Sequence, residues 1–479
     1  MTAKSWVVAA LCGLFLAGTA AAQCVSTLVP VSQPVVFPNH AAGPLAWTGS
    51  QFGMAKQDAD PSTNAIWFAV YDANLNQIHG DNLVAASTLA GPRIVLWNGT
   101  EFAVFYSRAD FQIVFQRVDA NGNAIGTPIA VAPFHALAPG EEFDAAWDPL
   151  RKAYVVLHSI VIGVERGVWL TSVAADGTQK SDAPITFFIA DPVYPRVSVT
   201  AAGNVGIVFS RSVNGGQQEL AFAIATPGTP PTAISTIRAG GSNPRIATDG
   251  KFFFVVYTAP VTGGSVLRSV KFDTAGRVVT ADAQLLSMGQ DVIAFSAIAN
   301  ATLGEWAVLY VTYPVGVVNA SLGETRLRRI PFNGATQIDA PFAADSTKRN
   351  LAPQSELTWN GNAYVASIGR VLSRAEGTES YLGRHCPFVV RAIATPTLSD
   401  PNVPVTLTAN PSGGAPPYSY TWSFGDISAN ETGQTVTHAY RQTGTYTVTL
   451  TATDANGSTT TSTVTITVAN LRHRSARHP

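Results

Sequence analysis

The chain has 479 residues, enough to bury a large core and to form more than one domain. Only 13% of the residues are charged, about half the usual share, while Gly, Pro, Thr, Ser and Val are abundant, as is typical of an all-β protein rich in turns. The formal net charge of −1 gives no electrostatic reason to expect nucleic acid or an anionic membrane as a partner.

Residues 1–22 have the pattern of an export signal that is cleaved from the mature chain. One lysine precedes an apolar run, Trp6–Leu16, and the segment ends in small residues, Ala20–Ala22. The run is too short to span a bilayer comfortably, so we expect a secreted protein, extracellular or periplasmic, without a membrane span. Lipid attachment at Cys24 stays open, although Gln23 occupies the place where lipoproteins carry a small residue.

A strand–turn–strand pattern recurs seven times, at intervals of about fifty residues. In Gly91–Arg108, GPRIVLWNGTEFAVFYSR, two apolar runs flank the pair Asn98-Gly99. The other copies begin at Pro44, Phe143, Pro195, Pro244, Phe295 and Ser355. Asn-Gly and Asp-Gly pairs tolerate the positive φ of type I′ turns, so we expect such turns at 98–99, 249–250 and 360–361.

Several hairpins continue into a third and a fourth apolar run, such as Phe111–Val118 and Ala124–Val131. Repeated units of four antiparallel strands are typical of propeller blades. A solenoid or a string of separate sandwiches is the alternative, but each unit is too small to bury its own faces and no linkers separate the units. We therefore predict an all-β protein with a seven-bladed β-propeller over residues 23–387.

The seventh unit, from about Leu351 to Cys386, has room for only three strands. We expect Ser26–Phe37, at the start of the mature chain, to supply the fourth strand and to close the ring. This closure would bring Cys24 beside Cys386. In an exported chain an isolated pair of cysteines is expected to form a disulfide.

Residues 388–470 are rich in Thr, Val and Pro and alternate apolar and Thr residues along two long runs, as half-buried strands do. Four blocks stand out: Trp422-Ser423-Phe424-Gly425-Asp426, His438-Ala439-Tyr440, Gly444-Thr445-Tyr446-Thr447-Val448, and Asp454 with Gly457. With this spacing the segment resembles the PKD (polycystic kidney disease) domain, an immunoglobulin-like β-sandwich. The resemblance implies an extracellular spacer or contact module without catalytic residues.

Within this segment Trp422 is expected to fill the core, and Tyr440 and Tyr446 to bury their rings while their hydroxyls stay in water. Ile427 departs from the family, which usually has a second glycine there, so the turn is expected to be altered. The tail, residues 471–479, is short, basic and without apolar periodicity, and we expect it to be disordered.

No zinc-protease, Cys-x-x-Cys, nucleophile-elbow, phosphate-loop or dinucleotide motif occurs in the sequence, nor do the Ser-x-Asp-x-Gly-x-x-Trp boxes of sialidase-type propellers. The eight histidines are scattered, with none at metal-ligand spacing from another. We therefore expect no metal, no cofactor and no catalytic residue that a linear motif would reveal, and we favour a protein that is not an enzyme.

Arginine follows proline at the start of three hairpins, at Arg93, Arg196 and Arg245. If first strands line the central channel, these guanidinium groups could ring one mouth and hold a carboxylate or sulfate ligand. The alternative is structural, with each arginine pairing with a carboxylate or with carbonyl groups of a neighbouring blade.

Two polar clusters are weaker candidates. Glu141, Glu142, Asp144 and Asp148 offer the paired carboxylates that glycoside hydrolysis needs, but such a cluster is more often a solvated face. Asp58–Asn64 has oxygen side chains at alternate positions, as calcium loops do, but it lacks their glycine and their distal glutamate.

Four tryptophans occupy one repeat position, at the end of the first strand: Trp47, Trp97, Trp147 and Trp359. Their repetition predicts packing between blades, although sugar-binding surfaces also use such rings as stacking platforms.

These features together predict an exported binding or adhesion protein. The propeller face would recognise an extracellular polysaccharide or a surface protein, and the PKD-like module would act as a spacer or contact domain. One alternative is a carbohydrate-active enzyme, a glycoside hydrolase or polysaccharide lyase whose acids converge from different blades to within about 5–10 Å. Another alternative is a self-associating component of a surface layer or matrix.

Overall fold

The computed structural model describes most of the chain between Ser26 and Asn470. The described ranges are 26–31, 41–57, 65–86, 93–108, 110–131, 143–162, 165–188, 194–213, 217–231, 233–262, 264–286, 290–314, 323–334, 337–342, 352–353, 355–373, 377–455 and 457–470. Within these ranges the chain is all-β and forms two compact units, Ser26–Cys386 and a second unit from Pro387 onward.

The first unit contains six four-stranded antiparallel sheets among its described residues. The first three are β2 (Ala41–Trp47), β3 (Gln51–Gln57), β4 (Ile66–Asp72) and β5 (Gln77–Ala85); β6 (Ile94–Trp97), β7 (Phe102–Ser107), β8 (Ile113–Val118) and β9 (Ala124–Ala130); and β10 (Phe143–Asp148), β11 (Ala153–Ile162), β12 (Glu165–Ala174) and β13 (Gln179–Phe188). The next three are β14 (Arg196–Val199), β15 (Val205–Val213), β16 (Gln217–Ala225) and β17 (Ser235–Ala239); β18 (Ser242–Thr248), β19 (Phe252–Val261), β20 (Gly264–Asp273) and β21 (Val278–Gln284); and β22 (Gln290–Asn300), β23 (Glu305–Pro314), β24 (Glu324–Pro331) and β25 (Ile338–Pro341).

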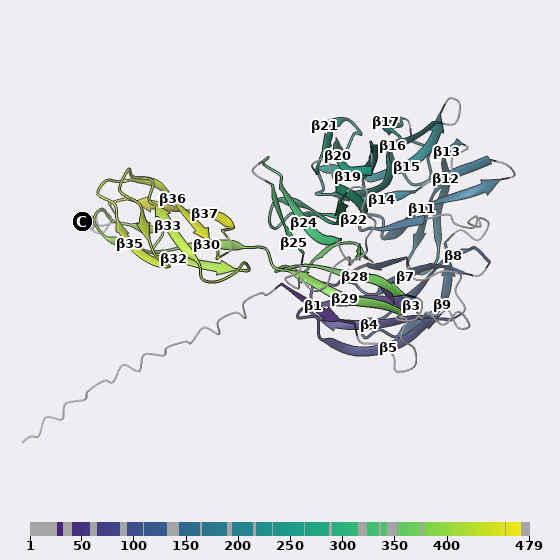
Figure 1. The fold of residues 1–479 in the computed structure, drawn as a ribbon, viewed down its shortest axis with the longest axis horizontal. Helices are drawn as coiled ribbons and strands as arrows, with labels where there is room; N and C mark the ends of the chain where they lie inside the picture. Colours follow the sequence, from purple (N-terminus) through teal and green to yellow (C-terminus); the bar gives the residue numbers. More distant parts are fainter. Residues whose placement is uncertain are drawn as a thin grey trace, which may run out of the picture. The chain divides into compact units, whose positions relative to one another are not determined.

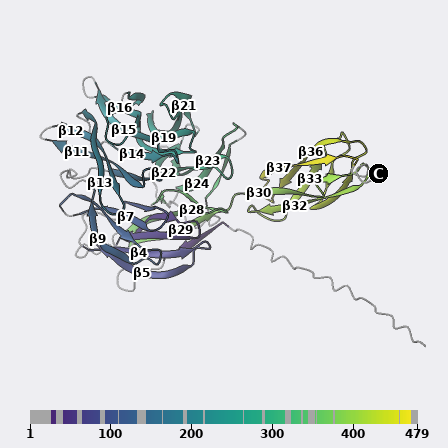
Figure 2. The same cartoon turned by 180° about the vertical axis from the view of Figure 1, so that it is seen from behind.

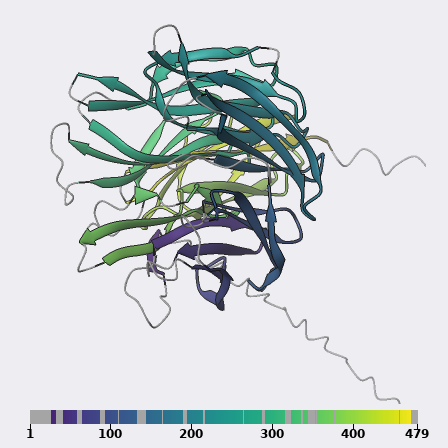
Figure 3. The same cartoon turned by 90° about the vertical axis from the view of Figure 1, so that its right-hand side faces the viewer.

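A seventh sheet joins the two ends of this unit. It contains β26 (Ala352–Pro353), β27 (Thr358–Trp359), β28 (Tyr364–Ser373), β29 (Gly377–His385) and β1 (Thr27–Pro30). Strand β1 runs antiparallel to β29, with Leu28 opposite Gly383. Figure 3 shows the purple start of the chain beside the green strands of this sheet.

The second strand of a propeller sheet is more deeply buried than the fourth, and the sequences of the strands explain the difference. Every residue of β7, FAVFYS, is buried, whereas β9, AIGTPIA, has no buried residue. The second strand is covered on both faces because apolar clusters form between consecutive sheets. One such cluster joins Phe68 of β4 to Phe102 of β7, whose rings are 5.2 Å apart.

The seven sheets lie around a common centre (Figures 1 and 2), and their first strands contact one another in chain order. Strand β2 contacts β6, and the series continues through β10, β14, β18, β22 and β26; β27 and β28 of the seventh sheet contact β2 again. The described sheets therefore form a closed ring, and the predicted seven-bladed β-propeller is confirmed. A closed ring leaves no sheet edge exposed at the junction between its first and last blades.

Close to this junction, the backbone N–H of Cys386 donates to Ser26 Oγ at 3.0 Å, and Cys386 is only 4% exposed. Cys24 lies outside the described residues. The disulfide between the two cysteines therefore stays a prediction, as does the cleavage of residues 1–22.

The hairpin turns differ from the type I′ prediction, which was wrong. Trp97 pairs directly with Phe102, so the loop has four residues, and of the pair Asn98-Gly99 only the glycine has positive φ, at 101°. The Asn98 side-chain oxygen accepts the N–H groups of Thr100 and Glu101 at 2.9 and 3.0 Å. The backbone N–H of Asn98 also donates to the Glu101 carbonyl at 3.1 Å, so backbone and side-chain bonds together close the turn with Gly99 in the left-handed conformation.

The second unit is a sandwich of two sheets, in the orders β30-β32-β35 and β31-β37-β36-β33-β34. Its strands are β30 (Val389–Thr395), β31 (Leu398–Ser399), β32 (Pro404–Ser412), β33 (Ser419–Ser423), β34 (Glu431–Thr432), β35 (Thr435–Ala439), β36 (Gly444–Thr453) and β37 (Thr459–Val468). In β36, Val448, Leu450 and Ala452 are buried in alternation with threonines, as the period of two requires.

Two details of the sandwich can be compared with the sequence predictions. Trp422 is fully buried in the core, as predicted, but Tyr440 is also buried, and its hydroxyl donates to the Phe424 carbonyl at 3.1 Å instead of facing water. Ile427 keeps the left-handed conformation that a glycine would take, with φ of 66° and a fully exposed side chain.

Candidate functional site

A cavity of about 750 Å³ occupies the centre of the propeller. This volume lies within the range of small-molecule sites, roughly 300–1,000 Å³. The first strands of all seven sheets contribute to its lining. Arg93, just before β6, and Trp97, at the end of β6, both line the cavity, so its wall carries charged and aromatic side chains.

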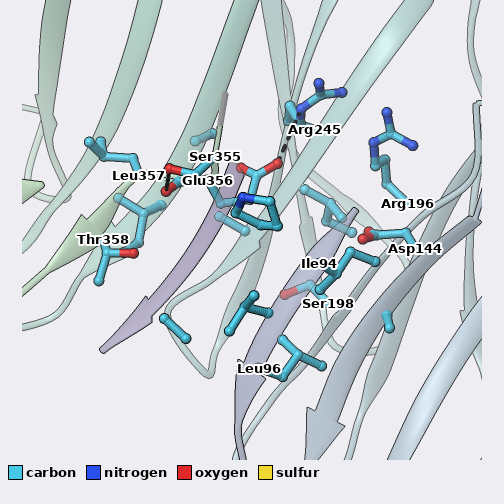
Figure 4. Close-up of a pocket in the computed structure, with 18 of the residues that line it drawn as sticks. Ile94, Leu96, Asp144, Arg196, Ser198, Arg245, Ser355, Glu356, Leu357 and Thr358 are labelled. Carbon is cyan, nitrogen blue, oxygen red and sulfur yellow. Dashed lines mark hydrogen bonds and ion pairs between the residues drawn. The ribbon is translucent and has the colours of Figure 1, made fainter. Parts of the chain in front are cut away.

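The structure brings the three predicted arginines, Arg93, Arg196 and Arg245, together in the lining of this cavity. Two carboxyl groups, those of Asp144 and Glu356, line it as well. We call these five charged side chains the arginine end. Figure 4 shows Arg245 joined to Glu356, with Arg196 and Asp144 beside each other.

Local contacts hold the guanidinium groups in place. Arg196 and Arg245 each donate to the carbonyl of the preceding proline, at 2.7 and 2.9 Å. Arg93 lies over the ring of Phe143 at 6.0 Å, and Arg245 lies over Phe295 at 5.6 Å. Stacking on an aromatic face suits the planar guanidinium and restricts its motion before any ligand arrives.

Asp144, in β10, bridges two neighbouring blades. Its Oδ2 accepts the backbone N–H of Val197, in β14, at 2.8 Å. Burial raises the pKa of Asp144 to about 6, and the negative charge of Glu356 acts in the same direction, whereas the charge of Arg196 and the N–H of Val197 oppose the shift. Asp144 therefore changes charge near neutral pH, far above the usual range for aspartate.

Glu356, just before β27, reaches from the seventh sheet toward the fifth. Its Oε1 lies 3.3 Å from Arg245 Nε, and its side chain is 62% exposed. Its Oε2 accepts a hydrogen bond from the Ser296 hydroxyl at 2.6 Å, and the same hydroxyl oxygen accepts the N–H of Leu357 at 2.7 Å. The Arg245–Glu356 pair thus joins two sheets that are not neighbours in the ring.

Sequence reasoning missed Glu356 as a site residue. A signal was present, because Glu356 stands three residues before Trp359, as Asp144 stands three residues before Trp147. In the second blade this position holds an apolar residue, Ile94. Counting back from the tryptophan would have marked both acids as facing the channel.

The other predicted clusters contribute less to the cavity. Asp148 accepts the N–H groups of Leu150 and Arg151, each at 3.0 Å, so it closes a hairpin turn. Glu141 and Glu142 lie outside the described residues, and so does the calcium-like segment Asp58–Asn64. Among the described residues, Asp144 lines the cavity and Asp148 does not.

The four tryptophans each contact an aromatic ring across their own hairpin. The ring centroids are 4.4 Å apart for Trp47 and Phe52, 4.7 Å for Trp97 and Phe102, 4.9 Å for Trp147 and Tyr154, and 4.9 Å for Trp359 and Tyr364. Trp97 and Trp147 also pack against the apolar clusters between blades, as the repetition predicted. All four remain half-buried, and Trp147 does not line the cavity.

Among the described residues, no group of three or more His, Cys, Asp or Glu side chains is placed to hold a metal ion. The same residues include no helix of sufficient length and hydropathy to cross a membrane.

The ring and its cavity define a β-propeller protein with a charged central channel, followed by a sandwich. Residues 387–468 match the family described as PKD domain, which confirms the resemblance seen in the sequence. No curated protein matches the chain.

Among solved structures the chain is similar to several proteins. One is the β-propeller domain of the Trilobed protease from Pyrococcus furiosus, with 9% identity and a TM-score of 0.45, over 72% of this chain and 95% of that one. Others are AofleA from Arthrobotrys oligospora, with 14% identity and a TM-score of 0.41 over 67% and 91%, and the polysaccharide lyase Uly1, with 7% identity and a TM-score of 0.45 over 74% and 91%. Similarity at this level does not indicate a common function.

Proposed function

We propose that the chain is an exported binding or adhesion protein that recognises a glycan or a protein surface with the arginine end of its propeller. The PKD domain would act as a spacer or contact module outside the cell or in the periplasm. The observation that carries this proposal is the convergence of Arg93, Arg196 and Arg245 on one cavity, from three different blades.

Among the described residues that line the cavity, three guanidinium groups stand beside two carboxyl groups, and a cluster of arginines suits a ligand that carries a negative charge. Arginine binds carboxylate and sulfate groups through paired hydrogen bonds, and a partly enclosed cavity strengthens such contacts relative to open solvent. The ligand would therefore be an acidic glycan or an acidic side chain on a protein surface.

A second candidate is a carbohydrate-active enzyme. Asp144 and Glu356 come from different blades, line the same cavity and interact electrostatically. A carboxyl group with a raised pKa beside an ionised one is the arrangement that glycosidases use for acid and base catalysis.

One experiment separates the two candidates. The protein without residues 1–22 is applied to an array of glycans and polysaccharides, which is read both for retention and for newly formed reducing ends. Retention without release supports the binding protein. Release of reducing ends, abolished in the Glu356→Gln variant, would support the enzyme instead, and retention of no glycan would overturn the glycan-binding proposal.

A further inference from the structure

The arginine end offers two kinds of polar group within one cavity. The guanidinium groups of Arg93, Arg196 and Arg245 can only donate hydrogen bonds, whereas ionised Asp144 and Glu356 can only accept them. A ligand that matches both kinds carries an anionic acceptor and several hydroxyl donors in one small unit.

Simpler ligands match the cavity less well. A free sulfate or phosphate ion would bind through acceptor oxygens and has no ring of hydroxyl groups to donate to the two carboxyl groups. A neutral sugar has hydroxyl groups for the carboxylates but brings no anionic group to the guanidinium groups, which form stronger hydrogen bonds with a charged acceptor than with a neutral one. A sugar acid, with one carboxylate on a ring of hydroxyl groups, satisfies both.

Resting on the proposed binding function, we infer that the arginine end binds a sugar acid, as a free unit or within an acidic polysaccharide, and that binding takes up a proton at Asp144. The ligand carboxylate would contact the guanidinium groups of Arg93 and Arg196, and the ligand hydroxyls would donate to Glu356. Protonated Asp144 would keep its bond from Val197 through its carbonyl oxygen.

The proton uptake follows from the charges around Asp144. Arg196 of β14 and the N–H of Val197 favour the ionised form, whereas Glu356, from the segment before β27, and the surrounding burial favour the neutral form. Arg93 and Arg245 line the same cavity. A ligand carboxylate adds one more negative charge, and this raises the proton affinity of Asp144 further.

The charge of Asp144 sets the direction of the pH effect on binding. Asp144 titrates at about pH 6 in the protein without ligand, so above that pH its negative charge opposes the ligand carboxylate. As the pH falls from 7.5 to 5.5, Asp144 becomes neutral and this repulsion disappears. The ligand carboxylate itself stays ionised down to about pH 4. Binding is therefore expected to tighten over this interval.

The test measures binding of galacturonate oligomers by calorimetry, with their fully methyl-esterified forms as a control that keeps the shape and removes the charge. We expect the free oligomers to bind about tenfold more tightly at pH 5.5 than at pH 7.5, which is about 1.4 kcal/mol. Calorimetry at pH 6.5 in two buffers of different ionisation enthalpy should show proton uptake.

Two substitutions and one control variant sharpen the test. Asp144→Asn should bind with the same affinity at both pH values, near that of the unchanged protein at pH 5.5. Arg196→Ala should lose at least tenfold in affinity at both pH values, whereas Arg277→Ala, which removes an exposed arginine from a turn outside the cavity, should bind normally.

Equal binding of the esterified oligomers, or a pH effect that persists in Asp144→Asn, would overturn the inference. The proposed glycan-binding function fails in a different way, when the array retains no glycan at all. If the array retains only neutral glycans, the chain is still a binding protein and the sugar-acid assignment is wrong. If it retains sulfated and uronic polysaccharides equally, charge alone explains binding, and the assignment is also wrong.

Discussion

At the scale of single residues, Ile427 combines a left-handed backbone with an exposed side chain. Ile427 is β-branched and adopts a φ of 66°, which is sterically costly for such a side chain. Its side chain is fully exposed, so no packing offsets this cost. The neighbouring Asp426 is held by a hydrogen bond of 2.7 Å with His438, which fixes the turn from the other side.

Replacing Ile427 with glycine should therefore stabilise the PKD domain by about 1 kcal/mol, after allowing for the greater freedom of glycine in the unfolded chain. Hydrogen exchange of the β36 amide groups in the full chain would measure the gain. Ile427→Val is the matched control, because valine is also β-branched and should give no gain. Equal stabilities of the glycine and valine variants would show that the turn is not strained.

At the scale of elements, neighbouring blades come close enough that one strand position has no room for a side chain. A Cβ atom added to Gly53, in β3, would lie 2.5 Å from the Phe68 ring and 2.6 Å from the Phe102 ring of the next blade. The same relation recurs at Gly206, which Phe253 approaches to 2.6 Å. These glycines are needed for close packing between sheets and not for their backbone angles.

The Gly53→Ala variant should lower the free energy of unfolding of the propeller by about 1–3 kcal/mol, because two buried rings would have to move. Urea denaturation would measure this as a lower midpoint with an unchanged slope. Gly80→Ala is the matched control within the same sheet, since a Cβ atom there meets nothing within 4 Å. A loss of stability as large in Gly80→Ala would contradict the packing explanation.

At the scale of the whole propeller, stability depends on the junction that β1 forms with β29. Every other described sheet of the ring is built from consecutive strands, so opening this one contact would expose sheet edges at the junction. A disulfide between Cys24 and Cys386 would secure the junction across a loop of more than three hundred residues. On the chain-entropy model such a bond contributes at most roughly 6 kcal/mol, because native-state strain is ignored.

We predict that Cys386→Ser lowers the free energy of unfolding of the propeller by roughly 2–5 kcal/mol under oxidising conditions. Cys24→Ser should cause the same loss, and the double substitution should add nothing to it. Thiol titration of the unfolded, unreduced protein without residues 1–22 checks the bond directly. Two reactive thiols in that assay would exclude it.

The sequence by itself determined the features that depend on local chemistry. Alternation of apolar residues, paired turn residues and the tryptophan at a fixed place in four repeats indicated strands, blades and the PKD domain. These signals are readable because each arises within a few neighbouring residues, where backbone preferences and side-chain periodicity act directly. The three arginines were recognisable for the same reason, since they share a repeat position.

Only the tertiary structure decided which polar groups meet. Asp144, Arg245 and Glu356 are separated by about a hundred residues from one to the next, and they share a cavity because the ring closes and orders the blades. The buried hydroxyl of Tyr440 likewise depends on a partner supplied by folding, the Phe424 carbonyl. Such contacts arise from the packing of distant segments, and local sequence preference does not encode them.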